Sequence, residues 1–439
     1  MSVLVLLVVF FALIVIGVPI AVALGSSALL SLIIFSQQPL ALMGQKVFAN
    51  LDHFALMAVP FFFLAAAFME SGGIVRHLVN FARSLVGHLP GGLGMTAILT
   101  CALFAAISGS SAATVVAVGG IMFPALVQDG YSPRYAIGAL STSGAIGILI
   151  PPSIPIILYG FVTETSIPKL FIAGIIPGIV YCLAMMLLAN RLAVRESYER
   201  SKPSAAIERW IAFRRAGPAL ILPIFLVVGI YGFPGFDIGG ISFSGGAIFT
   251  PTEAAVMCVA IALAIGSLVY RQQRLGTTWR TIVAVMPRVG MLFWIVTNAV
   301  LFGFFLAQQG IPDAVARWIV SLDMQPWTFL LLVNLILVIV GLFMDGVPVI
   351  LMFIPVLFPA SQAMGIDPVH FGIIVIVNIE LGLVTPPVGI NLYVGSAVSD
   401  LPVHTVFRAC LPWIVVDVII LALVTYVPWL STFLPGFMS

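Results

Sequence analysis

Long apolar segments recur from one end of this chain to the other, and they constrain its fold more than any other feature. A helix that crosses the hydrocarbon core of a bilayer needs about 20 consecutive apolar residues. Several segments exceed that length, and Gly and Pro interrupt them. The segments lie at residues 4–35, 54–69, 93–127, 135–162, 170–190, 216–233, 247–270, 281–307, 328–360, 371–398 and 406–434. The pattern predicts an all-α polytopic membrane protein embedded in a lipid bilayer.

The charge content agrees with this prediction. Only 8% of the 439 residues are charged, whereas roughly 25% is usual in a soluble domain. A soluble fold could not cover the apolar surface of a chain that is 62% hydrophobic. The net charge of +2 is too small to predict a nucleic-acid partner. The first 35 residues lack the charged start of a cleavable signal peptide, so we expect them to be retained as membrane helix.

The sequence contains no group of residues typical of an enzyme or a metal centre. The five His and four Cys residues are scattered, without metal-ligand spacing or an HExxH motif. No GxxxxGK[ST] loop is present, so the chain does not use ATP directly. We therefore expect neither an enzyme nor an ATP-driven pump.

The basic residues predict how the chain is oriented. Eleven of the eighteen Lys and Arg residues fall in two groups, at residues 191–215 and 271–288. The positive-inside rule places both groups in the cytoplasm. Two helices then run out and back between them, which leaves the Gly-rich segment 232–246 outside.

The second half of the chain repeats part of the first at a fixed offset of 235 residues. The Phe-Pro-Ala motif at 123–125 recurs at 358–360, and the Pro-Pro pair at 151–152 recurs at 386–387. Gly130, Pro133 and Gly147 likewise match Gly365, Pro368 and Gly382. If the segments 93–127 and 328–360 are both hairpins, the two copies cross the membrane in opposite senses. Inverted repeats with interrupted helices are typical of secondary transporters, with the binding site between the copies.

Each predicted hairpin has a polar break near its centre, Ser-Gly-Ser-Ser at 108–111 and Met-Asp-Gly at 344–346. Irregular backbone at membrane depth is tolerated only where it lines a cavity within the protein. Its carbonyls and half-helix ends suit a hard cation such as sodium, or an anion at a helix N-terminus. Close packing of small residues is the alternative explanation of the first break.

A helix interrupted by Pro-Pro follows each hairpin, and proline leaves backbone carbonyls unpaired about one turn earlier. Polar residues precede each pair: residues 141–144 in the first copy, Asn378, Glu380 and Thr385 in the second. Their hydroxyls could also bond their own helix. Asp345 and Glu380 are acidic groups at membrane depth and therefore functional candidates; we favour Asp345 because it lies at a hairpin tip. Glu253, by contrast, belongs to a predicted capping box that begins at Thr250.

Six segments resemble the large membrane subunit of TRAP (tripartite ATP-independent periplasmic) transporters, and together they span nearly the whole chain. They are FFFLAAAFMESGGI at 61–74, ISGSSAATVVAVG at 107–119, PPSIPIILYG at 151–160, TPTEAA at 250–255, FMDGVPVILMFIP at 343–355 and ELGLVTPPVGINLY at 380–393. The resemblance implies a sodium-driven importer of an organic acid in the bacterial inner membrane, working by an elevator motion. It also implies two partners: a small four-helix membrane subunit (Q subunit), expected here as a separate chain, and a periplasmic substrate-binding protein (P subunit).

The resemblance also implies how the chain is divided. Residues 54–165 and 307–400 are expected to form the two repeats of the moving transport domain. Residues 1–53 and 166–306 are expected to form the scaffold, and residues 401–439 a C-terminal membrane helix.

The family's sites, carried over residue by residue, imply about two sodium sites. The first involves Ser108, Ser110 or Ser111 with Gly144 and Pro151. The second involves Gly341, Asp345, Thr385, Pro386 and Gly389. Substrate is expected between the hairpin tips, in contact with Ser110, Ser111, Asp345, Gly346 and Asn391.

The sequence does not select among the family's substrates, which include C4-dicarboxylates, sialic acid and other sugar or keto acids. No single intramembrane Arg stands out as a carboxylate clamp. A proton-coupled transporter of the same fold, with Asp345 or Glu380 carrying the proton, is the nearest alternative. A channel with re-entrant loops is a more distant one, and a membrane-embedded enzyme the most distant.

Overall fold

Helices make up almost all of the structure. The computed structural model describes residues 2–36, 39–198, 203–232, 236–238, 241–243 and 248–438. Within these residues, eight helices are long and apolar enough to cross a membrane. Most of the Gly-rich segment predicted to lie outside, and Arg200 and Lys202 of the first basic group, fall outside the described residues.

The helices that precede the first hairpin are α1 (Ser2–Val15), α2 (Ile20–Phe35), α3 (Leu40–Leu51), the 3₁₀ helix η1 (Phe54–Met57), α4 (Ala58–Ser71) and α5 (Ile74–Val86). The first apolar segment thus forms two helices that pack against each other, rather than one long helix. Gly17, at φ 86°, and Pro19 lie at the break. A proline cannot continue the hydrogen-bond ladder of a helix, and Gly tolerates the left-handed turn.

The first repeat contains the hairpin α6 (Gly92–Ser108) and α7 (Ser111–Gln128), followed by α8 (Pro133–Ser143), η2 (Gly144–Ile148) and α9 (Ile154–Thr163). The second contains α15 (Ile311–Ser321), the hairpin α16 (Pro326–Gly341) and α17 (Gly346–Ala363), then α18 (Pro368–Leu383) and α19 (Ile390–Ser399). Both predicted hairpins and both predicted breaks at Pro-Pro are therefore present.

The repeat holds at the level of single elements. Helices α7 and α17 are each 18 residues long, begin at equivalent positions, and contain the matched prolines Pro124 and Pro359. Ser132 and Asp367, the predicted N-caps, accept hydrogen bonds from the first turns of α8 and α18. The Pro-Pro peptide bond is cis in both copies.

Between and after the repeats lie α10 (Ile167–Ala173), α11 (Ile175–Arg195), α12 (Ala206–Tyr231), β1 (Phe236–Ile238), β2 (Ile241–Phe243), α13 (Pro251–Ala264), the π-helix η3 (Ile265–Val269), α14 (Leu275–Gln308), α20 (Val403–Tyr426), α21 (Trp429–Thr432) and η4 (Pro435–Met438). The antiparallel pair β1–β2 was not predicted. The capping box of Thr250 and Glu253 at the start of α13 is confirmed.

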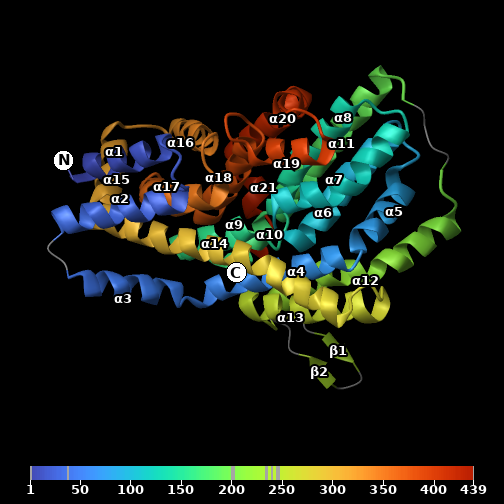
Figure 1. The fold of residues 1–439 in the computed structure, drawn as a ribbon, viewed down its shortest axis with the longest axis horizontal. Coiled ribbons are helices and arrows are strands. Elements are labelled where there is room, and N and C mark those ends of the chain that lie inside the picture. Colours follow the sequence, from blue (N-terminus) through green and yellow to red (C-terminus); the bar gives the residue numbers. More distant parts are fainter. Residues whose placement is uncertain are drawn as a thin grey trace.

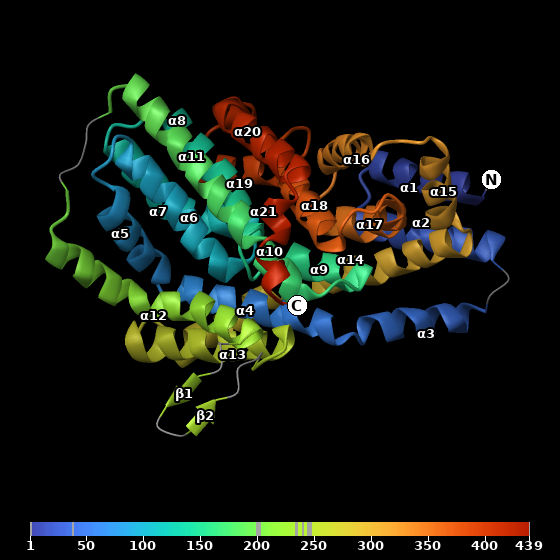
Figure 2. The ribbon, with the colours of Figure 1, turned by 180° about the vertical axis from the view of Figure 1, so that it is seen from behind.

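Helix α14 contacts both the N-terminal helices and the second repeat. It is 34 residues long, or about 51 Å at 1.5 Å per residue, and it packs against α2, α3, α4, α15 and α17. Figures 1 and 2 show α3, α4, α12 and α13 along one side of the molecule, with the hairpins and broken helices on the other. Helix α4 packs against α13 and α14, which were predicted as scaffold. The division into moving and static helices remains a prediction.

Candidate functional site

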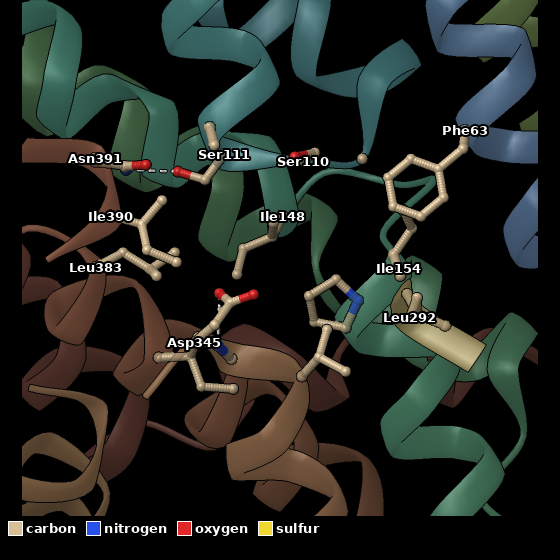
Figure 3. A pocket seen from close by; sticks show the side chains of 16 residues that line it. Phe63, Ser110, Ser111, Ile148, Ile154, Leu292, Asp345, Leu383, Ile390 and Asn391 are labelled. Atoms are coloured by element: carbon tan, nitrogen blue, oxygen red, sulfur yellow. Dashed lines mark hydrogen bonds between the residues drawn. The ribbon is translucent and has the colours of Figure 1, made fainter. Parts of the chain in front are cut away.

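The tips of the two hairpins meet at one cavity of about 140 Å³ (Figure 3). We call residues 108–111 tip 1 and residues 344–346 tip 2. Residues of both tips line this central cavity, together with the segments that follow the two Pro-Pro pairs. All five residues predicted to contact substrate are among its lining residues: Ser110, Ser111, Asp345, Gly346 and Asn391.

Four helix N-termini converge on the central cavity. Helices α7, α9, α17 and α19 begin at Ser111, Ile154, Gly346 and Ile390, and each of these residues lines it. The first turn of a helix carries unpaired N–H groups and a partial positive charge, so it attracts anions. Convergence of four such ends makes the cavity suitable for a carboxylate.

Asp345 supplies the negative charge of the site. It is the only charged residue among the described residues that line the central cavity, and its side chain points from tip 2 into the cavity towards the serines of tip 1 (Figure 3). Its Oδ1 accepts a 2.8 Å hydrogen bond from the backbone N of Gly346. Asp345 is therefore the N-cap of α17 and also presents a carboxylate to the cavity.

Side chains of the second repeat hold tip 1 in place. The Oγ of Ser111 donates to Oε2 of Glu380 (3.2 Å) and accepts from Nδ2 of Asn391 (2.7 Å). The same Asn391 nitrogen donates to the carbonyl of Ser141 (3.2 Å). Glu380 Oε1 and Asn391 Oδ1 are buried and have no hydrogen-bond partner among the described residues. Glu380, ranked below Asp345 from the sequence, thus lies directly behind tip 1.

The residues of the first predicted sodium site lie where tip 1 meets the first broken helix. Ser108 Oγ lies 2.9 Å from Thr114 Oγ1, which donates to the carbonyl of Ser110 (2.8 Å). A methyl group at Gly144 would lie 3.0 Å from the carbonyl oxygen of Ser111. Pro151 is buried in the same broken helix. Hydroxyl and carbonyl oxygens, the ligands that hard cations prefer, therefore gather here.

Thr114 was missed from the sequence. The only signal for it was a hydroxyl four residues after Ser110, and a threonine in a helix more often bonds its own backbone.

The second predicted sodium site surrounds the base of tip 2. A methyl group at Gly382 would lie 2.9 Å from backbone atoms of Gly341, so α16 and α18 touch through their backbones. The backbone N of Val388 donates to the carbonyl of Leu342 (3.0 Å), which fixes the segment of Pro386 and Gly389 beside the hairpin. This contact brings Thr385, Pro386 and Gly389 close to the end of α16, where Gly341 lies.

Two details of this second group differ from the simplest expectation. Thr385 Oγ1 donates to the carbonyl of Leu381 (2.6 Å), which is the bond to its own helix considered as the alternative. Asp345 lies on the central-cavity side and hydrogen-bonds Gly346. The structure therefore groups Asp345 with the predicted substrate residues.

Sequence reasoning also missed residues that close the central cavity from α4 and α14, namely Phe63 and Leu292. It assigned Arg288 to a cytoplasmic basic group, yet Arg288 lies within α14 and lines a neighbouring cavity with Glu70. An arginine inside an otherwise apolar segment was the available signal.

Two inverted hairpins, two broken helices and a cavity between the hairpin tips define a membrane transporter of the inverted-repeat class. Residues 7–430 match the family described as "Tripartite ATP-independent periplasmic transporter, DctM component". The chain belongs to this family.

Individual proteins agree with the family. The chain is 42% identical to the C4-dicarboxylate TRAP transporter large permease protein DctM of Pseudomonas aeruginosa, over 95% of this chain and 94% of that protein. It is 35% identical to the sialic acid TRAP transporter large permease protein SiaM of Vibrio cholerae, over 95% of each chain. The solved structure of the Alcanivorax borkumensis YdaH transporter has a similar fold, with a TM-score of 0.62, 17% identity and 90% coverage of each chain.

Membership in the family establishes the general role of the protein. The chain is the large permease component of a TRAP transporter and crosses the inner membrane several times. It works with a small membrane subunit and a periplasmic binding protein. The relatives are transporter permeases rather than enzymes.

Proposed function

We propose that this permease imports a small organic acid, of the C4-dicarboxylate type, together with sodium ions. The observation that carries the proposal is the convergence of both hairpin tips and four helix N-termini on the central cavity. The positive helix ends attract carboxylates. The hydroxyl and carbonyl oxygens behind each tip suit sodium, which supplies further positive charge next to the substrate.

The size of the central cavity supports a small substrate. A cavity of about 150 Å³ holds a molecule the size of benzene, and the central cavity measures about 140 Å³. A four-carbon dicarboxylate is only slightly larger than benzene. Sialic acid has more than twice as many atoms as the dicarboxylate. The name of the Pseudomonas aeruginosa relative points the same way.

The chain's own residues have distinct tasks in this mechanism. Helix ends at tip 1 and tip 2 orient the carboxylates, and Asn391 holds Ser111 so that tip 1 keeps its position. Sodium binding behind the tips orders them around the substrate. The repeats then carry the loaded site along the scaffold, an elevator motion that fits an inverted-repeat architecture.

The test is uptake into proteoliposomes that contain the permease and its small membrane subunit. Labelled succinate, sialic acid and a monocarboxylate are each supplied with and without the binding protein and an inward sodium gradient. Accumulation of succinate that needs both supports the proposal. Accumulation driven by a proton gradient would mean that the coupling ion is the proton rather than sodium. Downhill flux that needs neither the binding protein nor an ion gradient would indicate a channel.

The elevator motion has its own test. Gly303 on α14 and Leu351 on α17 line the same cavity, which is separate from the central cavity. The space around Gly303 is open. The variant Gly303→Cys/Leu351→Cys, joined by a bifunctional thiol reagent, should lose uptake and regain it when a cleavable linker is cut. The native cysteines are buried, so they should not react with the reagent. Each single-cysteine variant, which cannot be crosslinked between α14 and α17, serves as a control. Full uptake by the crosslinked protein contradicts a sliding motion between α14 and the hairpin α16–α17.

A further inference from the structure

A second cavity, of about 320 Å³, adjoins the central cavity on the side of the hairpin α6–α7. Phe63, Ser110 and Ala112 line both cavities, so the two meet at tip 1. The walls of this second cavity come from α4 and α14 on one side and from α6, α7 and α19 on the other. A ligand that leaves the central cavity past tip 1 therefore enters the second one.

The second cavity contains an arginine that the proposed mechanism does not use. Arg288 lines it from α14, and Glu70 lines it from α4. Among the described residues, none forms a hydrogen bond or an ion pair with Arg288, although Glu70 is near enough to attract it electrostatically. Arg288 lies thirteen residues into α14, about 20 Å from its start. The side chain of Arg288 is exposed, so its guanidinium is free to meet a ligand in the second cavity. A charged residue inside an otherwise apolar segment is a candidate for function.

A third cavity, of about 380 Å³, continues the route. Glu70 and Val116 line both the second and the third cavity. The third also reaches Arg76 and Gln272. Gln272 lies between Arg271 and Arg274, the part of the basic group before α14, which the positive-inside rule places in the cytoplasm. The three cavities thus form a path from the hairpin tips to the cytoplasmic side.

The other hairpin has a matching cavity, whose basic side chain is a lysine, Lys46. Leu351 and Pro355 line a cavity of about 380 Å³ beside α17, and they match Val116 and Gly120 of α7 at the repeat offset of 235. The opposite end of α14, including Gly303, forms its wall. No arginine is among its described lining residues. Each cavity thus has a basic side chain, but among the described lining residues a guanidinium is present only on the route past tip 1.

We infer that Arg288 is a binding station for a substrate carboxylate on the route from the central cavity to the cytoplasm. The inference rests on the proposed function, because it takes an organic anion as the cargo. A guanidinium matches a carboxylate with two parallel hydrogen bonds, which a lysine cannot reproduce. Arg288 receives the carboxylate as the substrate passes Phe63 and tip 1.

Glu70 completes the station. Its carboxylate attracts the guanidinium and repels the anion, so it lowers the affinity of Arg288 for the substrate. Weak binding is what a release path needs, because a tightly held substrate does not leave. Removal of the Glu70 charge should therefore strengthen binding, whereas removal of the Arg288 charge should weaken it.

The experiment measures occupation of the path by thiol protection. Val116→Cys places a reactive thiol at the boundary of the second and third cavities, and the native cysteines are buried. The purified complex with its small subunit is labelled with a maleimide at increasing succinate, with the neutral diamide of succinate as the control ligand. Added variants are Arg288→Gln, Arg288→Lys, Glu70→Gln and, on the same helix but away from the cavities, Arg280→Gln.

Succinate, but not its diamide, should protect the thiol. Loss of a charged hydrogen bond costs about 1.5 kcal/mol or more, so Arg288→Gln should raise the half-protecting concentration about tenfold or more. Arg288→Lys should raise it by a smaller factor, Glu70→Gln should lower it, and Arg280→Gln should leave it unchanged. Melting curves of each variant identify any that fail to fold; Arg288→Lys then serves in place of Arg288→Gln.

The outcomes separate this inference from the proposed function. If the parent protein takes up succinate but Arg288→Gln and Arg280→Gln are protected alike, the station is wrong and the proposed function stands. Absence of succinate protection in the parent protein also contradicts the binding of substrate at Arg288. Failure of sodium-dependent uptake of any acid, with protection that depends on Arg288, contradicts the proposed transport and keeps the binding site.

Discussion

The two hairpin tips occupy equivalent places in the repeat, but they are held in different ways. Tip 1 is anchored by side chains of the other repeat, since Ser111 bonds Glu380 and Asn391 across 269 and 280 residues of sequence. Tip 2 is fixed by the backbone of its own repeat, through the contact of Gly341 with Gly382 and the bond from Val388 to Leu342. Among the described residues, no side chain of the first repeat hydrogen-bonds tip 2.

This difference assigns different tasks to the tips. Tip 1 ties the two repeats together, so its position depends on the whole transport core being assembled. Tip 2 leaves the carboxylate of Asp345 on the cavity face, where it can respond to ions and substrate. The inverted symmetry of the chain therefore does not extend to the chemistry of the site.

The largest effect is expected from Asp345→Asn. Asn is as good an N-cap as Asp, so α17 should remain capped while the cavity loses its charge. The carboxylate of Asp345 repels an anionic substrate, so the interaction that is lost is its attraction for a bound sodium ion. Loss of such an interaction with a charged group, about 3 kcal/mol, corresponds to a decrease in sodium-driven uptake of about 100-fold. The control is Asp367→Asn, which removes the charge of the N-cap of α18 outside the central cavity. Equal uptake by the two variants would show that Asp345 acts only as a cap.

A smaller effect is expected where tip 2 rests on its own repeat. In Gly382→Ala the new methyl group meets the backbone of Gly341 at 2.9 Å, and backbone cannot move away cheaply. Overpacking of this kind costs about 1–3 kcal/mol. The melting temperature in detergent should fall, and uptake should fall about tenfold. Gly290→Ala, with open space around the new methyl group, should change neither, and a similar loss there would refute the role of the Gly341–Gly382 contact.

Ser111→Ala tests the anchoring of tip 1. The variant removes two hydrogen bonds to the second repeat, each worth about 1 kcal/mol. We expect the half-saturating substrate concentration to rise several-fold, with less effect on melting than Gly382→Ala. Ser84→Ala is the matched control, because Ser84 Oγ bonds only the carbonyl of Phe81 in its own helix. An unchanged half-saturating concentration would mean that the cross-repeat bonds do not position tip 1.

The smallest effect is expected from Thr385→Val at the base of tip 2. The hydroxyl donates to Leu381, but its lone pairs remain available to a cation. Loss of one neutral ligand should raise the half-saturating sodium concentration about threefold. Thr385→Ser keeps the hydroxyl and should retain the sodium dependence of the parent protein. Identical sodium titrations for both variants would remove Thr385 from the proposed ion site.

The sequence by itself determined the membrane fold, because apolar segments of that length and number have no stable arrangement in water. It also determined the register of the repeat, both hairpins and both interrupted helices. These features depend on local chemistry, since proline interrupts a helix wherever it stands and Asp or Ser caps the helix that follows it. The N-caps at Ser132 and Asp367 illustrate this.

Only the tertiary structure decided which of these elements meet. The bonds from Ser111 to Glu380 and Asn391 join residues that no pattern in the sequence pairs, and the same holds for Arg288 and Glu70 in the second cavity. The contacts depend on how α4, α14 and the hairpins pack, and that packing sums many weak interactions between distant segments. A repeat in the sequence fixes equivalent positions, whereas the charges and hydrogen bonds at those positions depend on neighbours that the repeat does not share.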